Sequence, residues 1–428
     1  MTALAHGVGT QHDLPISPFY AYAGAFAALL VSFLALGLLW SDSRFRGDRS
    51  GRPLPAALQR LADARATRTA LRALGAAGLL AVVLALLLGP AGPEHNPAPG
   101  AVYVLLWVGL VPASLLLGPV GRLCSPLRAL YSLRSLLPAR RRPPRPPRPL
   151  PAGLGIRPAA AGLLVFTWLE LVAPERASAT ALLVFLAAHT AVHLLGAARH
   201  GPEWFARADP FEVYSALLAR LSPLGRRADG RLVLRNPLHG LDSTPPVPGL
   251  VATVCVLLGS TAYDGFSDSP RWIAAVQTSP LGRTAAATLG LLAAVALVAV
   301  LYCLSAGALR LLNRRIDHPL TAFAHSLLPI ALGYLVAHYF SLFVTEGPRT
   351  VMVALGTDNA AAPAPPLTPG GLAALQVTAI VTGHVLGVVA AHDRAVRLFP
   401  PARAVAGQLP LFVLMIAYTL GGIGLLIA

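Results

Sequence analysis

The chain has 428 residues, of which 55% are hydrophobic and only 12% are charged. A soluble domain carries about 25% charged residues, so this composition excludes an ordinary soluble protein and indicates an integral membrane protein. All 34 basic residues are arginine, and the net charge is +16. In a soluble protein such a charge would suggest nucleic-acid binding. Here the arginines gather in a few loops, which indicates membrane topology and no nucleic-acid partner.

Ten apolar stretches follow one another along the chain, each near the length of about 20 residues that crosses a bilayer. The sequence therefore predicts an all-α fold, a polytopic membrane bundle of about ten transmembrane helices that forms a single domain over residues 1–428. The predicted spans are Phe19–Trp40, Ala70–Gly89, Val102–Val120, Arg157–Val172, Ser178–Ala197, Pro248–Tyr263, Thr284–Leu304, Pro319–Val344, Leu372–Ala391 and Val405–Ala428.

The arginines predict the orientation of these spans. The loops after the odd-numbered spans, with their helix ends, hold 30 of the 34 arginines. Basic loops stay in the cytoplasm, so both termini should lie outside. The absence of lysine beside abundant alanine, proline and glycine is typical of a GC-rich bacterial genome, and we expect a multi-pass protein of the bacterial plasma membrane. The four remaining arginines fall on the other face: Arg176, Arg271, Arg283 and Arg349.

Three cytoplasmic loops carry most of the arginine. Residues 41–69 form an Arg-rich loop, and residues 121–156 form a Pro- and Arg-rich loop that we expect to be disordered. Residues 198–247 form a third loop with an amphipathic helix near 210–222, predicted to lie on the cytoplasmic leaflet. Arginines in these loops could bind anionic lipid at about 1 kcal/mol each. The sequence predicts no particular membrane-complex subunit.

The helix in the third loop has a clear start signal. Asp209 is suited to the N-cap, Pro210 to the first helical position and Glu212 to the third. Further along, Asp229-Gly230 favours a turn into a short strand over Arg231–Arg235.

Histidines at membrane depth are the main candidates for chemistry, because an ionisable side chain in a span is costly. His189 and His193 are four residues apart, so they lie about 40° apart on one helix face. His325 and His384 lie on two other spans, and with His189 they fall about 9–12 Å from the cytoplasmic helix ends. The four residues form a candidate metal group.

Several cofactors suit this group. Imidazole ligands favour a divalent transition metal, here Zn, Mn, Co, Cu or Fe. Haem is less favoured, because His325 and His338 on one helix point about 140° apart. The alternative without a metal is that each histidine only hydrogen-bonds a neighbouring helix. A zinc-protease function is excluded, because the glutamate of the H-E-x-x-H motif is missing from HTAVH.

A second candidate group lies toward the outer face. Glu170, His338 and Tyr334 fall at similar height, and His6 and His12 of the N-terminal segment reach the same side. A carboxylate with histidines suits a metal ion or a proton relay.

Several stretches are similar to a family of bacterial multi-span membrane proteins commonly labelled fenitrothion hydrolase. The resemblance covers most of the chain and implies hydrolysis of an organophosphorus triester, usually with a divalent metal. It implies no particular catalytic residue. The stretches that carry it are HGVGTQHDLPIS, DPFEVYSALLARLSPLGRRADGRLVLRNPL, STAYDGFSDSPRW, HSLLPIALGYLVAHYF and GHVLGVVAAHDRA.

Three functions remain open at this point. The first is a membrane protein with a histidine metal or haem site that serves redox chemistry, metal handling or proton movement. The second is a metal-dependent hydrolase, as the resemblance implies. The third is a metal-free transporter or structural component.

Overall fold

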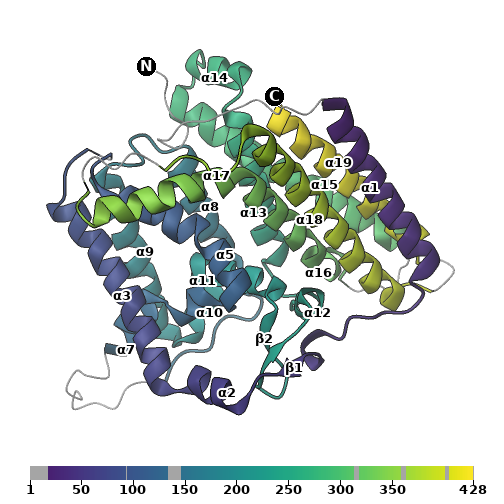
Figure 1. Ribbon diagram of the computed structural model, residues 1–428, viewed down its shortest axis with the longest axis horizontal. Coiled ribbons are helices and arrows are strands. Elements are labelled where there is room, and N and C mark those ends of the chain that lie inside the picture. The colour runs from purple at the N-terminus through teal and green to yellow at the C-terminus, as the bar shows by residue number, and fades with distance from the viewer. Residues whose placement is uncertain are drawn as a thin grey trace.

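The computed structural model describes residues 18–92, 94–133, 146–312, 318–357, 363–400 and 404–427. Its ribbon is a bundle of long helices with a small β-sheet at one end (Figure 1). Within the described residues, nine helices are long and apolar enough to cross a membrane. The predicted all-α polytopic fold is confirmed.

The membrane-spanning elements match the ten predicted stretches in order. The first five are α1 (Pro18–Leu39), α3 (Arg65–Leu88), the continuous run of α4 (Pro97–Gly100), the π-helical η2 (Ala101–Val108) and α5 (Leu110–Leu117), then α8 (Arg157–Leu171) and α9 (Ala179–His200). The other five are α13 (Leu250–Ser267), α15 (Arg283–Leu312), η5 (Ala324–Leu327) with α17 (Leu328–Ala354), α18 (Pro369–Leu398) and α19 (Leu409–Ile427).

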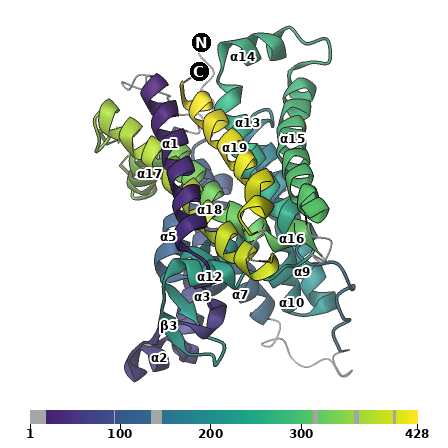
Figure 2. The ribbon, with the colours of Figure 1, turned by 90° about the vertical axis from the view of Figure 1, so that its right-hand side faces the viewer.

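Helix α8 is the short member of the set, with 15 residues. It is not among the nine long apolar helices. However, α1 begins and α19 ends at the same end of the molecule, opposite α2 (Ala56–Asp63) and the sheet (Figure 2). An even number of crossings is needed for that arrangement, so α8 counts as the tenth.

The outward surface of the bundle is apolar. Leu38 on α1 and Leu88 on α3 are 84% and 81% exposed. Exposed leucines of this extent would aggregate in water, whereas in a bilayer they contact lipid. The polar and titratable side chains discussed below are instead buried between helices.

The end of the molecule opposite the start of α1 and the end of α19 carries a three-stranded antiparallel sheet in the order β1-β3-β2. The strand predicted after Asp229-Gly230 is confirmed as β3 (Leu232–Leu234), and Gly230 has a φ of +84° in the turn. Residues 134–145 of the predicted disordered loop lie outside the described residues. The remaining elements at this end are η1 (Gly47–Arg49), β1 (Arg52–Pro53), β2 (Leu224–Arg226), α12 (Pro237–Asp242), α16 (Pro319–Ala322) and η7 (Ala406–Gln408).

Further short helices connect the spans in both halves of the chain. In the first half they are α6 (Val120–Leu123), α7 (Pro126–Leu133), α10 (Glu203–Ala208) and α11 (Pro210–Leu218), the last continued by η4 (Ala219–Leu221). In the second half α14 (Pro270–Gln277) joins α13 to α15 at the end of the molecule where α19 ends (Figure 2).

Helix α11 has the predicted start but a different environment. Asp209 caps it by accepting hydrogen bonds from the backbone N–H groups of Phe211 and Glu212. All of its residues except Ala216 are buried, because α11 packs against α5, α6 and α8. The helix therefore lies inside the bundle rather than on the leaflet surface, and it carries polar side chains into the protein.

Candidate metal centre

Helix α9 supplies the first two residues of the site. His189 and His193 lie one turn apart in its C-terminal half, and their ring centroids are 4.4 Å apart. Phe185 stacks on His189 at 5.7 Å, and Phe211 meets the same ring edge-to-face at 5.5 Å. These aromatic neighbours fix the direction of the His189 ring.

A reversal of the chain brings the third residue to them. Gly201, with a φ of +80°, ends α9, and α10 folds back along it. Gly196 has no side chain, so the Trp204 indole fits against α9 at a place where a Cβ would lie 2.2 Å from it. The chain then reaches Asp209 at the level of the two histidines.

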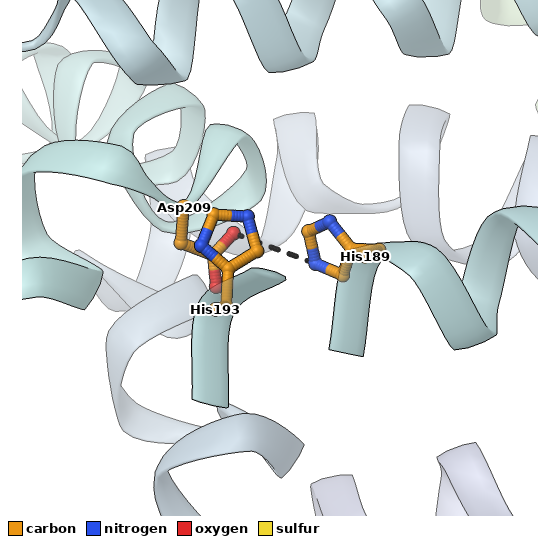
Figure 3. Close-up of side chains that lie close together, drawn as sticks. All are labelled: His189, His193 and Asp209. Atoms are coloured by element: carbon orange, nitrogen blue, oxygen red, sulfur yellow. Dashed lines mark ion pairs between the residues drawn. The ribbon is translucent and has the colours of Figure 1, made fainter. Parts of the chain in front are cut away.

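His189, His193 and Asp209 form a compact group, which we call the inner triad (Figure 3). One ligand atom from each lies within 4.8 Å of the others, and His189 Nε2 is 4.0 Å from Asp209 Oδ1. Metal–ligand bonds of about 2.0–2.2 Å place tetrahedral donors roughly 3.4 Å apart. Movements of about 1 Å or less would therefore bring the three donors onto one ion.

The triad is closed off from bulk solvent. The His189 and Asp209 side chains are 12% and 6% exposed, and His193 is 5% exposed. Among the described residues, His193 Nδ1 is buried without a hydrogen-bond partner. A buried polar atom without a partner is costly, so a ligand at this position would relieve a real penalty.

The charge of Asp209 depends on its surroundings. Burial raises the pKa of this carboxyl to about 6, and Glu212 adds to the rise, whereas His193 and the two capping N–H groups oppose it. A neighbouring cation would favour the ionised form. The carboxylate is therefore well placed as a ligand and costly to bury alone.

An ion pair behind the triad holds α11 in place. Arg128 of α7 donates from Nε and Nη2 to the two carboxylate oxygens of Glu212, at 2.7 and 2.8 Å. Both side chains are buried, and the guanidinium also lies 5.2 Å from the centroid of the Phe205 ring. This bidentate contact sets the position of Asp209, one turn earlier on the same helix.

The structure brings together two of the four predicted inner histidines. His325 is buried in η5, where the charges of Arg394 and Asp242 act on it. His384 of α18 contacts Ile380 O through Nδ1 at 2.9 Å, and its ring meets Tyr334 edge-to-face at 5.5 Å. Neither belongs to the inner triad.

His338, from the predicted outer group, pairs with a residue that the sequence did not single out. His338 Nε2 is 2.7 Å from Asp264 Oδ2, and Tyr339 donates its hydroxyl to the same oxygen at 2.9 Å. We call Asp264, His338 and Tyr339 the outer cluster. Glu170 of α8 is buried and close enough for its charge to act on Tyr339.

The other predicted outer residues lie elsewhere. Tyr334 donates its hydroxyl to the backbone carbonyl of Tyr418 on α19. His6 and His12 lie outside the described residues.

The sequence pattern identifies neither Asp209 as a neighbour of the two histidines nor Asp264 as part of a span. It indicates only a helix cap at Asp209, although the position of Asp209 soon after the HTAVH span is a signal for a candidate ligand. The predicted sixth span ends at Tyr263 and leaves Asp264 in a loop, whereas α13 continues to Ser267. A span extended by one turn would have included it.

Comparison of the chain with protein-family models, curated protein sequences and solved structures gave no match.

Proposed function

We propose that this polytopic membrane protein binds a divalent transition metal through His189, His193 and Asp209. The observation that carries the proposal is the inner triad itself, with donor atoms within 4.8 Å of one another and a buried His193 nitrogen that lacks a hydrogen-bond partner among the described residues. Two imidazoles and one carboxylate are a donor set that Zn, Fe or Co accepts.

The number of ligands supports a reactive or exchanging site over a purely structural one. Structural zinc sites use four protein ligands, whereas catalytic sites use three and keep one position for substrate or water. The triad offers three, and the metal would supply Lewis-acid or redox chemistry at the open position. The chain's own contribution is to orient the donors, through Asp209 at the α11 cap and the Arg128–Glu212 pair behind it.

The geometry favours an ion over haem. Histidines that ligate haem iron approach it along the axis, from opposite faces of the macrocycle when there are two. Here both imidazoles and the carboxylate converge from one side within a few ångströms. The arrangement leaves the histidines too close together to lie on opposite faces.

Hydrolysis is a second candidate, favoured by the donor set. Two histidines and a carboxylate with an open position form the ligand pattern of hydrolytic zinc sites. The family resemblance described above implies an organophosphorus triester as substrate. Metal handling and redox chemistry use the same site and are distinguished from hydrolysis by the assays below.

Metal content tests the binding proposal. Full-length protein, purified in detergent with chelator and then reloaded with Zn²⁺ or Co²⁺, should retain close to one ion per chain. In His193→Ala, the affinity for the metal ion should fall at least about 100-fold, because a direct ligand is lost. Co²⁺-loaded protein should show visible ligand-field absorption that the variant lacks.

His384→Ala is the matched control, since His384 is also a buried imidazole of a span but lies outside the triad. It should retain metal as the unaltered chain does. Substoichiometric metal in the unaltered protein, or equal loss in both variants, would overturn the proposal. A nitrophenyl phosphotriester tests hydrolysis separately: turnover that disappears in His193→Ala supports it, and no turnover by metal-loaded protein rejects it.

A further inference from the structure

A groove lies between α1 and α18, two helices that pack against each other at the side of the bundle (Figure 1). Its volume is about 340 Å³, within the range of about 300–1,000 Å³ that is typical of ligand sites. The side of a membrane bundle faces lipid, so lipid is the medium that reaches this groove. The residues that line it include Tyr20, Gly24 and Ala25 of α1 and Thr378, Val381 and Thr382 of α18.

Gly24 keeps the groove open. Glycine in a span ordinarily lets two helices approach closely. Gly333 and Gly383 do so between α17 and α18, where a Cβ would lie 2.6 and 2.5 Å from backbone oxygens of the facing helix. A Cβ at Gly24 would meet no atom within 4 Å. The missing side chain of Gly24 therefore leaves space that the packing of α1 does not use.

Two threonine hydroxyls in the groove have no partner among the described residues. A threonine in a helix can donate to the carbonyl one turn earlier, as Thr253, Thr261 and Thr419 do here. Thr378 and Thr382, one turn apart, make no hydrogen bond within the described part of the chain. A hydroxyl without a partner is costly in hydrocarbon. An oxygen acceptor carried by the occupant would remove that cost.

Tyr20 indicates the depth of the groove in the membrane. Phe19 and Tyr20, at the start of α1, are each 71% exposed. Aromatic side chains, tyrosine above all, gather at the level of the lipid headgroups. Thr378 lines the same groove as Tyr20. The threonines are therefore close to the level at which the ester groups of a glycerolipid lie and its acyl chains begin.

We propose that this groove binds an acyl chain of one glycerophospholipid. Thr378 and Thr382 donate hydrogen bonds to the ester carbonyl of that chain, and the chain itself lies over Gly24 and Ala25. Tyr20 is the one aromatic residue among the described residues that line the groove, so no pair of rings is present to hold a planar headgroup such as a quinone. A flexible chain with an ester suits the apolar floor and the two hydroxyls. The bound lipid fills the space between α1 and α18.

Native mass spectrometry of full-length protein, purified from membranes in mild detergent, tests for the bound lipid. The protein should retain one glycerophospholipid per chain. In Gly24→Leu the lipid affinity should fall at least about tenfold, because the new side chain takes the place of several methylene groups of the acyl chain. Gly78→Leu on α3 is the matched control, since a Cβ there also meets no atom within 4 Å. It should retain the lipid.

The role of the hydroxyls is tested with dioleoylphosphatidylcholine and its dialkyl ether analogue, added to delipidated protein. Both have the same neutral headgroup, so attraction to arginine does not separate them. The unaltered chain should bind the ester lipid about fivefold more tightly, because the ether lacks the carbonyl acceptor. The double variant Thr378→Val, Thr382→Val should bind the two lipids equally. Because valine has nearly the shape of threonine, this test remains available if Gly24→Leu does not fold.

Four results would overturn the proposal. They are the absence of a retained lipid, retention of an isoprenoid quinone or a second copy of the chain in its place, equal loss of lipid in Gly24→Leu and Gly78→Leu, and no preference of the unaltered chain for the ester. His193→Ala should retain the lipid, because the groove shares no residue with the inner triad. Failure of metal binding and failure of lipid binding are thus separate outcomes.

Discussion

The inner triad and the outer cluster use the same residue types at different spacings. In the inner triad, His189 Nε2 and Asp209 Oδ1 are 4.0 Å apart. In the outer cluster, His338 Nε2 and Asp264 Oδ2 are 2.7 Å apart. The first distance leaves room for an ion between donor and acceptor, and the second is filled by a single hydrogen. Histidine with aspartate therefore indicates no chemistry until the distance between the two is known.

A third arrangement completes the comparison. Arg128 and Glu212 are as buried as either histidine group, yet their bidentate contact holds a fixed pair of charges. Within one membrane domain, a carboxylate is thus held by arginine in a bidentate ion pair, hydrogen-bonded to histidine at 2.7 Å, or set 4.0 Å from histidine at the proposed metal site. The predictions below separate these roles.

The largest effect, on stability, is expected from breaking the ion pair between Arg128 and Glu212. Arg128→Met leaves the Glu212 carboxylate buried and unpaired, which should lower the free energy of unfolding by about 3–5 kcal/mol. Denaturant unfolding in detergent micelles measures it. Because an unpaired charge is the cause, adding Glu212→Met to Arg128→Met should restore much of the loss. If the double variant were no more stable than Arg128→Met, the unpaired Glu212 charge would not be the cause of the lost stability.

Asp209→Asn should weaken metal binding by about 100-fold while leaving α11 intact. Asparagine caps a helix as well as aspartate does, so the hydrogen bonds to Phe211 and Glu212 are kept and only the anionic ligand is lost. Competition with a metallochromic indicator gives the affinity. Asp264→Asn makes the same chemical change in the outer cluster and should leave the metal affinity of the protein unchanged. Equal losses would mean that the two groups do not differ as proposed.

The smallest effect concerns pH at a carboxylate held by arginine. Burial alone would raise the pKa of Asp242, but hydrogen bonds and ion pairs with Arg397 and Arg394 lower it below its usual value. Since the folded-state pKa is lowered, the stabilisation is fully present above the unfolded value of about 3.9 and is lost as pH falls further. Hydrogen exchange in α12, corrected for intrinsic rates, should rise a few-fold only below about pH 4. A rise in the hydrogen-exchange rate of α12 near pH 6 would contradict this prediction.

Much of the fold was predictable from sequence, because span length and arginine placement depend on local composition. Each predicted stretch matches a helix, and the His189–His193 pair follows from helical periodicity alone. The lateral positions of the helices do not follow from local composition or periodicity. The sequence predicts one depth for His189, His325 and His384, but tertiary packing buries His325 in η5 and places His384 against Tyr334, away from the inner triad. Asp209 joins the triad only because α10 folds back, which local pattern does not show.

The 15 residues of α8 have a consequence for the membrane itself. At 1.5 Å per residue α8 is roughly 22 Å long, against a hydrocarbon layer of about 30 Å. Such hydrophobic mismatch is met by local thinning of the bilayer or by protein that fills the deficit. Buried α11 packs against α8, and Pro210 reaches Gly162 on it. Protein therefore makes up part of the deficit along α8, because α11 occupies depth that this short helix does not span.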